Sequence, residues 1–167
     1  MTPNQQAFFF DAIRRGDTGD VSKALELLPE LIDAPDTKGY TPIIIAAYNE
    51  KDEIVSLLLR LGANANSQDL AGNSALMGAS FKGYRKIVEI LLHHGASVNL
   101  LNGQGASALT FAATFGQLEI ARLLLEHGAN KNVRDQRNKS PLDHARTQEN
   151  EAMISLLDQG LDQDLGI

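Results

Sequence analysis

Residues 102–134, NGQGASALTFAATFGQLEIARLLLEHGANKNVR, decide the fold, because the sequence on either side of them repeats the same pattern. Gly39, Gly72 and Gly105 lie 33 residues apart, and Asn138 continues the series. Two further series keep this interval: Asp36, Asp69, Asn102 and Asp135, and Ala46, Ala79, Ala112 and Ala145. A period of this size is typical of a solenoid, in which each unit buries its apolar face against the next.

Local signals within residues 102–134 predict two helices and a connecting turn. Ser107 is a favourable N-cap residue, and the apolar residues that follow it at helical spacing predict a short first helix. Gly116 suits the left-handed conformation that ends such a helix. A second, mostly apolar helix is predicted over residues 118–125, closed by Gly128. The polar run over residues 129–138 predicts a turn or hairpin that leads into the next unit.

These motifs resemble the ankyrin-repeat family, whose pattern is D-x-x-G-x-T-P-L-H-x-A-A, a second helix that ends in L-L-L, and then G-A-x-x-N. Residues 36–68 match it best, with Asp36, Gly39, Thr41, Pro42, Ala46, Ala47, Leu57, Leu58, Leu59, Gly62, Ala63, Asn64 and Asn66. The resemblance implies an all-α solenoid of helix-turn-helix pairs joined by β-hairpin-like segments, here called fingers. It implies about five repeats with degenerate terminal caps.

The repeat interval places the whole chain, residues 1–167, in a single domain. It predicts an N-terminal capping repeat over residues 1–35 and full repeats over residues 36–68, 69–101 and 102–134. A C-terminal capping repeat over residues 135–160 and a loosely held tail over residues 161–167 complete the division. In the first cap, Phe8, Phe9, Ala12 and Ile13 are expected to form the apolar face of a helix.

Two positions qualify the resemblance. Thr41 is expected to cap a helix that begins with Pro42, where the missing amide hydrogen costs nothing. The histidine of the family pattern is replaced by Ile44, Met77, Thr110 and Asp143. This replacement is expected to remove a hydrogen bond that ties adjacent turns in the family.

Composition excludes several classes of function. The net charge of −6 opposes general binding to nucleic acid, which needs clustered Lys and Arg. The absence of Cys excludes disulfides and thiolate chemistry. No apolar run approaches the ~18 residues of a membrane span, and the N-terminus lacks the features of a secretory signal. A cytoplasmic monomer is therefore expected, with a trimmed signal peptide left open as the alternative.

Candidate chemistry is sparse. His93, His94 and His127 fall at the ends of predicted second helices, where an imidazole faces the negative end of the helix dipole, so no metal site is expected. No catalytic residue and no cofactor is predicted. An enzyme or small-ligand binder is the less favoured alternative, and it would require Asp143, His144 and Arg146 to converge in a deep, closed pocket.

The favoured hypothesis is a non-catalytic module that binds a partner protein. In the ankyrin family, the finger tips and first helices line a concave groove that binds proteins. The finger-tip positions are Lys38, Tyr40, Leu70, Asn73, Gln104, Arg137 and Lys139, and the first-helix positions are Tyr48, Asn49, Phe81, Lys82, Thr114 and Phe115. Tyr40, Tyr48, Phe81 and Phe115 are expected to form one aromatic stripe, with packing between neighbouring first helices as the alternative role of these rings.

The resemblance to small bacterial ankyrin-repeat proteins suggests two more specific roles. One is that of an immunity or antitoxin-like protein that neutralises a toxin or effector. The other is that of an accessory factor for an oxidative-stress enzyme such as catalase. A self-assembling structural module is a third alternative, and the identity of the partner stays open.

Overall fold

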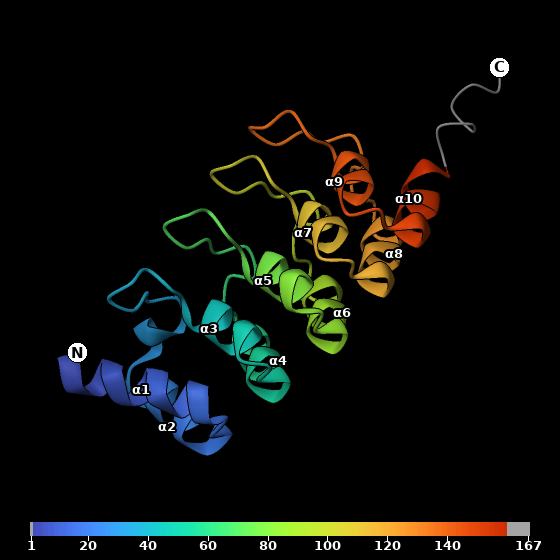
Figure 1. The fold of residues 1–167 in the computed structure, drawn as a ribbon. Helices are drawn as coiled ribbons and strands as arrows, with labels where there is room; N and C mark the ends of the chain where they lie inside the picture. Colours follow the sequence, from blue (N-terminus) through green and yellow to red (C-terminus); the bar gives the residue numbers. More distant parts are fainter. Residues whose placement is uncertain (1, 160–167) are drawn as a thin grey trace.

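The computed structural model describes residues 2–159, which form five helix pairs stacked in a line (Figure 1). The pairs are α1 (Pro3–Arg15) with α2 (Thr18–Leu27), α3 (Pro42–Tyr48) with α4 (Asp52–Arg60), α5 (Ala75–Lys82) with α6 (Arg85–His93), α7 (Ala108–Thr114) with α8 (Leu118–Glu126), and α9 (Pro141–Thr147) with α10 (Glu151–Asp158). A short 3₁₀ helix, η1 (Pro29–Ile32), follows α2. The prediction of an all-α solenoid of about five repeats is confirmed.

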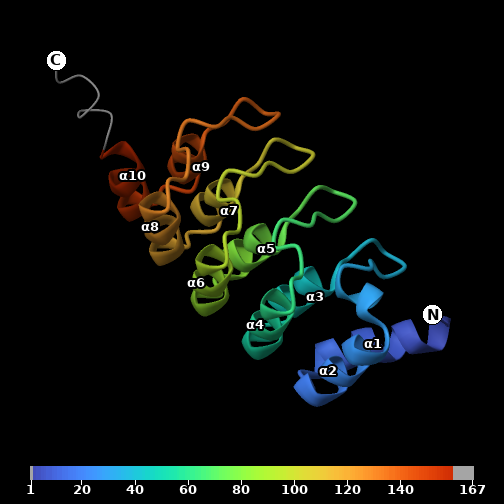
Figure 2. The same ribbon diagram turned by 180° about the vertical axis from the view of Figure 1, so that it is seen from behind.

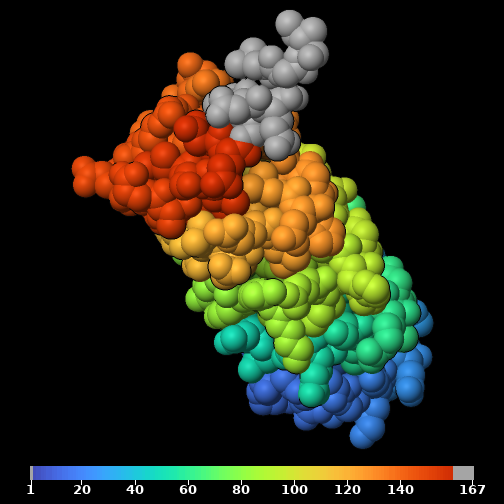
Figure 3. All heavy atoms as spheres, turned by 90° about the vertical axis from the view of Figure 1, so that its right-hand side faces the viewer, coloured from blue at the N-terminus to red at the C-terminus, as the bar shows by residue number. Residues whose placement is uncertain are grey.

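The helices form two rows, and the fingers project from one of them. The first helices α3, α5, α7 and α9 pack side by side in one row, and the second helices α4, α6, α8 and α10 form the other row. The views from the front and from behind show the fingers on the side of the first helices (Figures 1 and 2). Seen from the side of the second helices, the repeats appear as successive bands along one elongated body (Figure 3).

The fingers are tight turns rather than paired strands. Within residues 2–159, the only β-type pairing is an isolated antiparallel bridge between Gln68 and Ser74. The tip glycines Gly39, Gly72 and Gly105 have φ angles of +83°, +81° and +74°, and Asn138 has a φ of +59°. The 33-residue glycine series therefore marks a left-handed position that every full finger needs.

The Asp and Asn series belongs to the same turns. The Oδ1 atom of Asp69 accepts hydrogen bonds from the backbone N–H groups of Ala71 at 2.9 Å and Asn73 at 2.8 Å. Asp36, Asn102 and Asp135 accept the corresponding pairs in their own fingers. A side chain that satisfies two backbone donors stabilises a tight turn in which those donors lack other partners.

Serine hydroxyls start three of the first helices. Ser107 Oγ accepts from the Thr110 N–H at 3.2 Å, and the Thr110 hydroxyl accepts from the Ser107 N–H at 3.1 Å. The pairs Ser74 with Met77 and Ser140 with Asp143 repeat this capping box. In these three repeats, the side chain at the family's histidine position therefore serves the helix start itself.

Thr41 behaves differently from the prediction. It holds the N-cap position of α3, with φ −76° and ψ 160°. Its hydroxyl lies 2.8 Å from Ser67 Oγ, so it ties α3 to the segment that leads into the next finger. Thr41 therefore occupies the predicted N-cap position, but its side chain accepts no hydrogen bond from the first turn of α3, because its hydroxyl is bonded to Ser67 instead.

The core is a continuous column of aliphatic side chains. One leucine of each second helix lies at the same repeat position, and all five are buried: Leu25, Leu58, Leu91, Leu124 and Leu157. The N-terminal cap differs in detail from the prediction. Phe9 and Phe10 enter the core, whereas Phe8 is 51% exposed. Three consecutive positions on a helix span ~200°, so they cannot all face one side.

Candidate functional site

Two hollows lie on the side of the fingers and first helices, the surface expected to form the concave groove, one near each end of the stack. The first, about 410 Å³ in volume, is enclosed by the first finger and α3, and its predicted site residues are Lys38, Tyr40, Tyr48, Asn49 and Asn73. The second, about 240 Å³, lies between the last two fingers and α7, and its predicted site residues are Gln104, Thr114, Phe115 and Arg137. Nine of the 13 predicted positions therefore gather in two places, and none of the 13 is buried.

Three aromatic side chains join these hollows into one surface. The rings of Tyr48 and Phe81 are stacked, with centroids 6.4 Å apart and planes 7° from parallel. Phe81 meets Phe115 edge to face at 4.6 Å. We call these residues, at or next to the ends of α3, α5 and α7, the aromatic row. Tyr40 lies on the first finger and lines the same hollow as Tyr48.

The aromatic row combines mutual packing with exposure. Tyr48 remains 47% exposed and Phe115 51% exposed, and Phe81 between them is half-buried. Ring pairs of this geometry contribute ~0.5–1.5 kcal/mol beyond the area they bury. Packing between neighbouring first helices therefore uses part of each ring, and about half of the two outer rings still faces solvent.

Lys82 places a positive charge beside the aromatic row. Its Nζ lies 4.8 Å from the ring centroid of Tyr48 and 5.8 Å from that of Tyr84. A cation over an aromatic face gains ~0.5–1 kcal/mol at an exposed site. The ammonium group is thus held near the middle of the groove.

The remaining predicted residues lie along the fingers. Leu70 is 88% exposed and rests against the tip of the preceding finger, where a Cβ on Gly39 would come within 2.6 Å of its Cγ. Asn73 Oδ1 accepts from the Asn102 side chain at 2.8 Å, which ties two fingers together. Lys139 Nζ donates to the Thr147 hydroxyl at 3.1 Å. Asn73 and Lys139 therefore also have structural partners.

The residues of the enzyme alternative do not converge. Asp143 turns back to the start of α9, where hydrogen bonds from the Ser140 N–H and hydroxyl hold its pKa below the ordinary value. His144 Nε2 lies 2.6 Å from Asp135 Oδ2 and lines the smaller hollow. Arg146 lies 3.9 Å from Asp158 and 4.0 Å from Asp143. Asp143 and Arg146 thus approach each other only at the limit of ion-pair distance, and His144 contacts Asp135 instead, so the three side chains do not converge in one pocket.

The carboxylate of Asp135 is largely enclosed, with a side chain only 10% exposed. Burial alone would raise its pKa, but hydrogen bonds from the backbone N–H of Lys139, from the His144 ring and from the backbone N–H of Arg137 lower the pKa of Asp135 below its ordinary value. The carboxylate therefore stays charged and anchors the last finger to α9.

Neither a metal-binding cluster of side chains nor a membrane-spanning helix occurs within residues 2–159. That part of the chain holds no group of three or more His, Asp or Glu side chains placed to bind a metal ion. His94 and His127 each place Nδ1 within 2.9 Å of a carbonyl oxygen one turn back in the preceding helix. Among the helices of these residues, none has the length and apolar character that crossing a bilayer requires.

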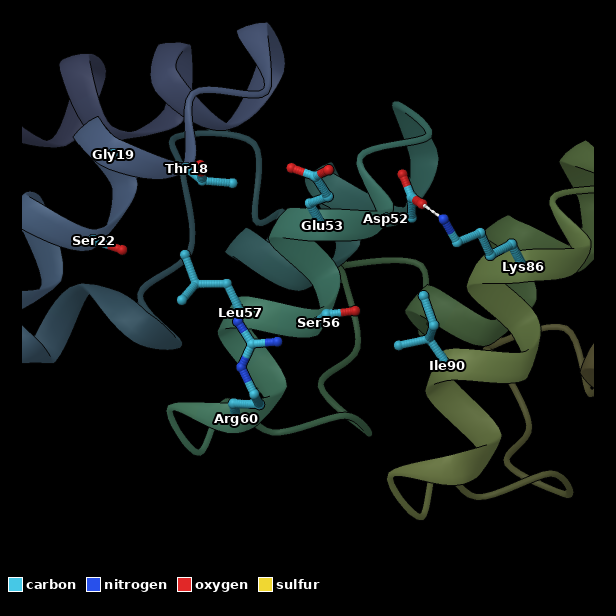
Figure 4. Close-up of a pocket in the computed structure, with 10 residues that line it drawn as sticks. All are labelled: Thr18, Gly19, Ser22, Asp52, Glu53, Ser56, Leu57, Arg60, Lys86 and Ile90. Carbon is cyan, nitrogen blue, oxygen red and sulfur yellow. Dashed lines mark ion pairs between the residues drawn. The ribbon is translucent and has the colours of Figure 1, made fainter.

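A third hollow, which the sequence analysis did not predict, lies on the side of the second helices (Figure 4). It measures about 520 Å³ and lies between α2, α4 and α6. Asp52 and Lys86 form an ion pair at its edge that joins α4 to α6, and the hydrogen bond from Lys86 lowers the pKa of Asp52. Several lining residues lie one repeat apart, such as Glu53 and Lys86, but residues at equivalent positions differ in chemistry, so no sequence motif marks the hollow.

Comparison with protein families agrees with the fold. Residues 9–102 match a family model described as ankyrin repeats in three copies. Residues 91–145 match a second model, described as ankyrin repeats in many copies. Ankyrin repeats are generally protein–protein interaction modules. With more than half of its length matched by one model, the chain belongs to the ankyrin-repeat family.

Proposed function

We propose that this protein is a non-catalytic module that binds a partner protein through its concave groove and finger tips. The aromatic row carries the proposal. It runs across three successive repeats and joins the two hollows, while Tyr48 and Phe115 keep about half of their surface exposed.

The exposed rings are better explained by binding than by stability. Packing against a neighbouring repeat needs only one face of each ring. A protein surface rarely keeps adjoining large apolar groups in water unless something covers them. Aromatic side chains are enriched among the residues that dominate binding energy, because each buries a large area and has few rotatable bonds.

The finger residues complete a rim around the aromatic row. Lys38, Tyr40 and Leu70 stand at the first two finger tips, and Gln104 and Arg137 at the last two. A polar rim around an apolar centre is the usual arrangement of a protein–protein interface. We therefore assign the 13 predicted positions to this surface, with the aromatic row at its centre.

The test is partner capture with matched variants. The immobilised chain, residues 1–167, is compared with Tyr48→Ala/Phe115→Ala and with Leu61→Ala, whose leucine is 51% exposed on the side of the second helices. Loss of a captured protein in the double variant only, with unchanged thermal unfolding, is expected. Equal capture by all three proteins, or a fall of several kcal/mol in the stability of the double variant, would place the interface elsewhere.

Mass spectrometry of the captured protein then separates the specific roles. A toxin or effector would support the immunity alternative. An oxidative-stress enzyme such as catalase would support the accessory role.

A further inference from the structure

The charges of the concave groove differ from those of the whole chain. The protein carries a net charge of −6. The finger carboxylates, however, are occupied by their own turns, whereas several cations at the groove point outward without a carboxylate partner. This difference bears on the kind of partner that the groove can hold.

The finger carboxylates make most of their hydrogen bonds within or next to their own fingers. Asp36, Asp69 and Asp135 each direct Oδ1 to two backbone N–H groups of their own finger, at 2.8–3.0 Å. The second oxygen of Asp36 lies 3.4 Å from an Arg14 nitrogen, and that of Asp135 lies 2.6 Å from the His144 ring. Asp36 and Asp69 line the first hollow and Asp135 the second, so these acids remain charged there, but most of their oxygens are already engaged by the turns, by Arg14 and by His144.

Three cations of the groove, by contrast, form no ion pair with a carboxylate of residues 2–159. Within residues 2–159, Lys38, Lys82 and Arg137 have no Asp or Glu oxygen within ion-pair distance. Lys38 lines the first hollow and Arg137 the second. Lys82 lies between them, beside the ring of Tyr48. Positive charge is thus available at both ends and at the middle of the aromatic row.

The spacing suits a short linear segment. The fingers of Lys38 and Arg137 precede α3 and α9, which are three helix-to-helix intervals apart. At ~8–10 Å for each packed interval the span is ~24–30 Å. An extended chain covers ~3.3 Å per residue, so about eight or nine residues suffice to reach from one hollow to the other.

We infer that the concave groove binds an acidic linear segment of the partner protein. Aromatic or large aliphatic side chains of the segment lie on the aromatic row, and its carboxylates meet Lys38, Lys82 and Arg137. The inference rests on the proposed function and adds the chemistry of the partner. Charge-assisted hydrogen bonds supply affinity and fix the register, and complementary charge speeds association.

A nucleic acid fits these observations less well. Three cations spread over three repeats neutralise few phosphates, and the acidic remainder of the chain repels a polyanion that extends past the groove. A peptide segment needs carboxylates only at the three matching points.

The first experiment is a selection of random 12-residue peptides displayed against the immobilised chain. Peptides with two or more Asp or Glu residues around an aromatic or large aliphatic residue are expected to be enriched. The most enriched peptide is then synthesised, and its affinity is measured by fluorescence anisotropy for the wild type, Phe115→Ala and two charge-reversal pairs.

The charge-reversal pairs are matched in net charge. Lys38→Glu/Arg137→Glu changes the groove and leaves the aromatic row and Lys82 untouched. Lys23→Glu/Arg60→Glu changes two exposed cations of second helices, α2 and α4. The first pair is expected to weaken peptide binding at least tenfold at low salt and by less at 0.5 M salt, because salt screens exposed charges. The second pair is expected to change binding less than twofold.

The other possible results each contradict one part of the proposal: the acidic segment, its binding surface or the proposed function. If neutral or basic peptides are enriched and Phe115→Ala abolishes their binding, the groove binds protein but the acidic segment is wrong. If acidic peptides bind both charge-reversal pairs equally, they bind elsewhere and the inference fails. If no peptide is sensitive to Phe115→Ala, the proposed function fails as well. A single-stranded 20-mer of thymidine that displaces the peptide at equal concentration would replace the acidic segment with a nucleic acid.

Discussion

Replacement of Gly72 by Ala tests how closely the fingers stack. Gly72 has a φ of +81°, and a Cβ placed on it would lie 2.8 Å from the backbone N of Gly103 in the next finger. It would also lie 3.1 Å from the Cα of Asn102. Both atoms are backbone and cannot swing aside, so the two fingers would have to separate. Their separation would strain the hydrogen bond from the Gly103 N–H to the Ala71 carbonyl, which measures 2.9 Å.

The chain supplies a matched control in Gly95, which has the same φ of +81°. A Cβ added to Gly95 would have no heavy atom of residues 2–159 within 4 Å beyond its immediate chain neighbours. Gly95→Ala therefore costs only the strain of the left-handed backbone, ~1–2 kcal/mol. Gly72→Ala costs the same amount, plus ~1 kcal/mol for the hydrogen bond and ~1–3 kcal/mol for overpacking. The difference in stability between the two variants is expected to be ~2–4 kcal/mol.

Urea unfolding followed by far-ultraviolet circular dichroism measures this difference. The slope of the transition should stay constant, so that a shift in midpoint reports a change in stability. Equal destabilisation by the two substitutions would refute the reasoning, because it would mean that adjacent fingers do not touch at Gly72.

Three further substitutions have defined outcomes. Ser80→Ala should stabilise the protein by ~1 kcal/mol in urea unfolding, because the fully buried Ser80 hydroxyl finds no hydrogen-bond partner among residues 2–159; a loss of stability would contradict this. Asp135→Asn should cost ~1–2 kcal/mol at pH 7, through the weakened contact with His144. Because the pKa of Asp135 is lowered in the folded state, the carboxylate stabilises the fold above its ordinary pKa, and the gap to the wild type should close as pH falls below ~4; a constant gap from pH 7 to 3 would contradict this. Lys86→Ala should leave the unfolding midpoint unchanged, since its ion pair with Asp52 is exposed to solvent, and a clear shift would show that the pair joins α4 and α6 more strongly than expected.

The sequence predicts the repeat architecture because each series has one physical cause. Gly39, Gly72 and Gly105 keep a left-handed tip, and the Asp and Asn series satisfies the N–H groups of the same turn. Causes of this kind act over four or five residues, so they can be recognised without coordinates. The buried leucine column, at the spacing of Leu58 and Leu91, follows the same interval.

Features that depend on a neighbouring repeat were predicted less well. The Thr41 hydroxyl bonds to Ser67, 26 residues away, instead of to an N–H of its own helix. The replacement of the family's histidine by Thr110 predicts the loss of a hydrogen bond, whereas the Thr110 hydroxyl completes a capping box. The Thr41 contact depends on a neighbouring repeat, whereas the Thr110 contact is local and follows the S/T-x-x pattern of a capping box.

In the candidate site, too, the repeat pattern predicts which residues share a face but not how their side chains pack. Repeat spacing places Tyr48 and Phe81 on one face, and the structure adds that their rings stack and that Phe115 meets Phe81 edge to face. The hollow between α2, α4 and α6 could not be predicted, because it arises from the separation of helices and not from a pattern of residues.

The central claim is that the exposed part of the aromatic row serves binding. Its most direct test is calorimetric titration of the captured partner into Phe115→Ala and Phe8→Ala. Both rings are 51% exposed, but Phe8 lies on α1 and lines neither hollow of the concave groove. A loss of at least tenfold in affinity for Phe115→Ala, with wild-type affinity for Phe8→Ala, is the predicted result. Equal affinities for the two variants would contradict the account.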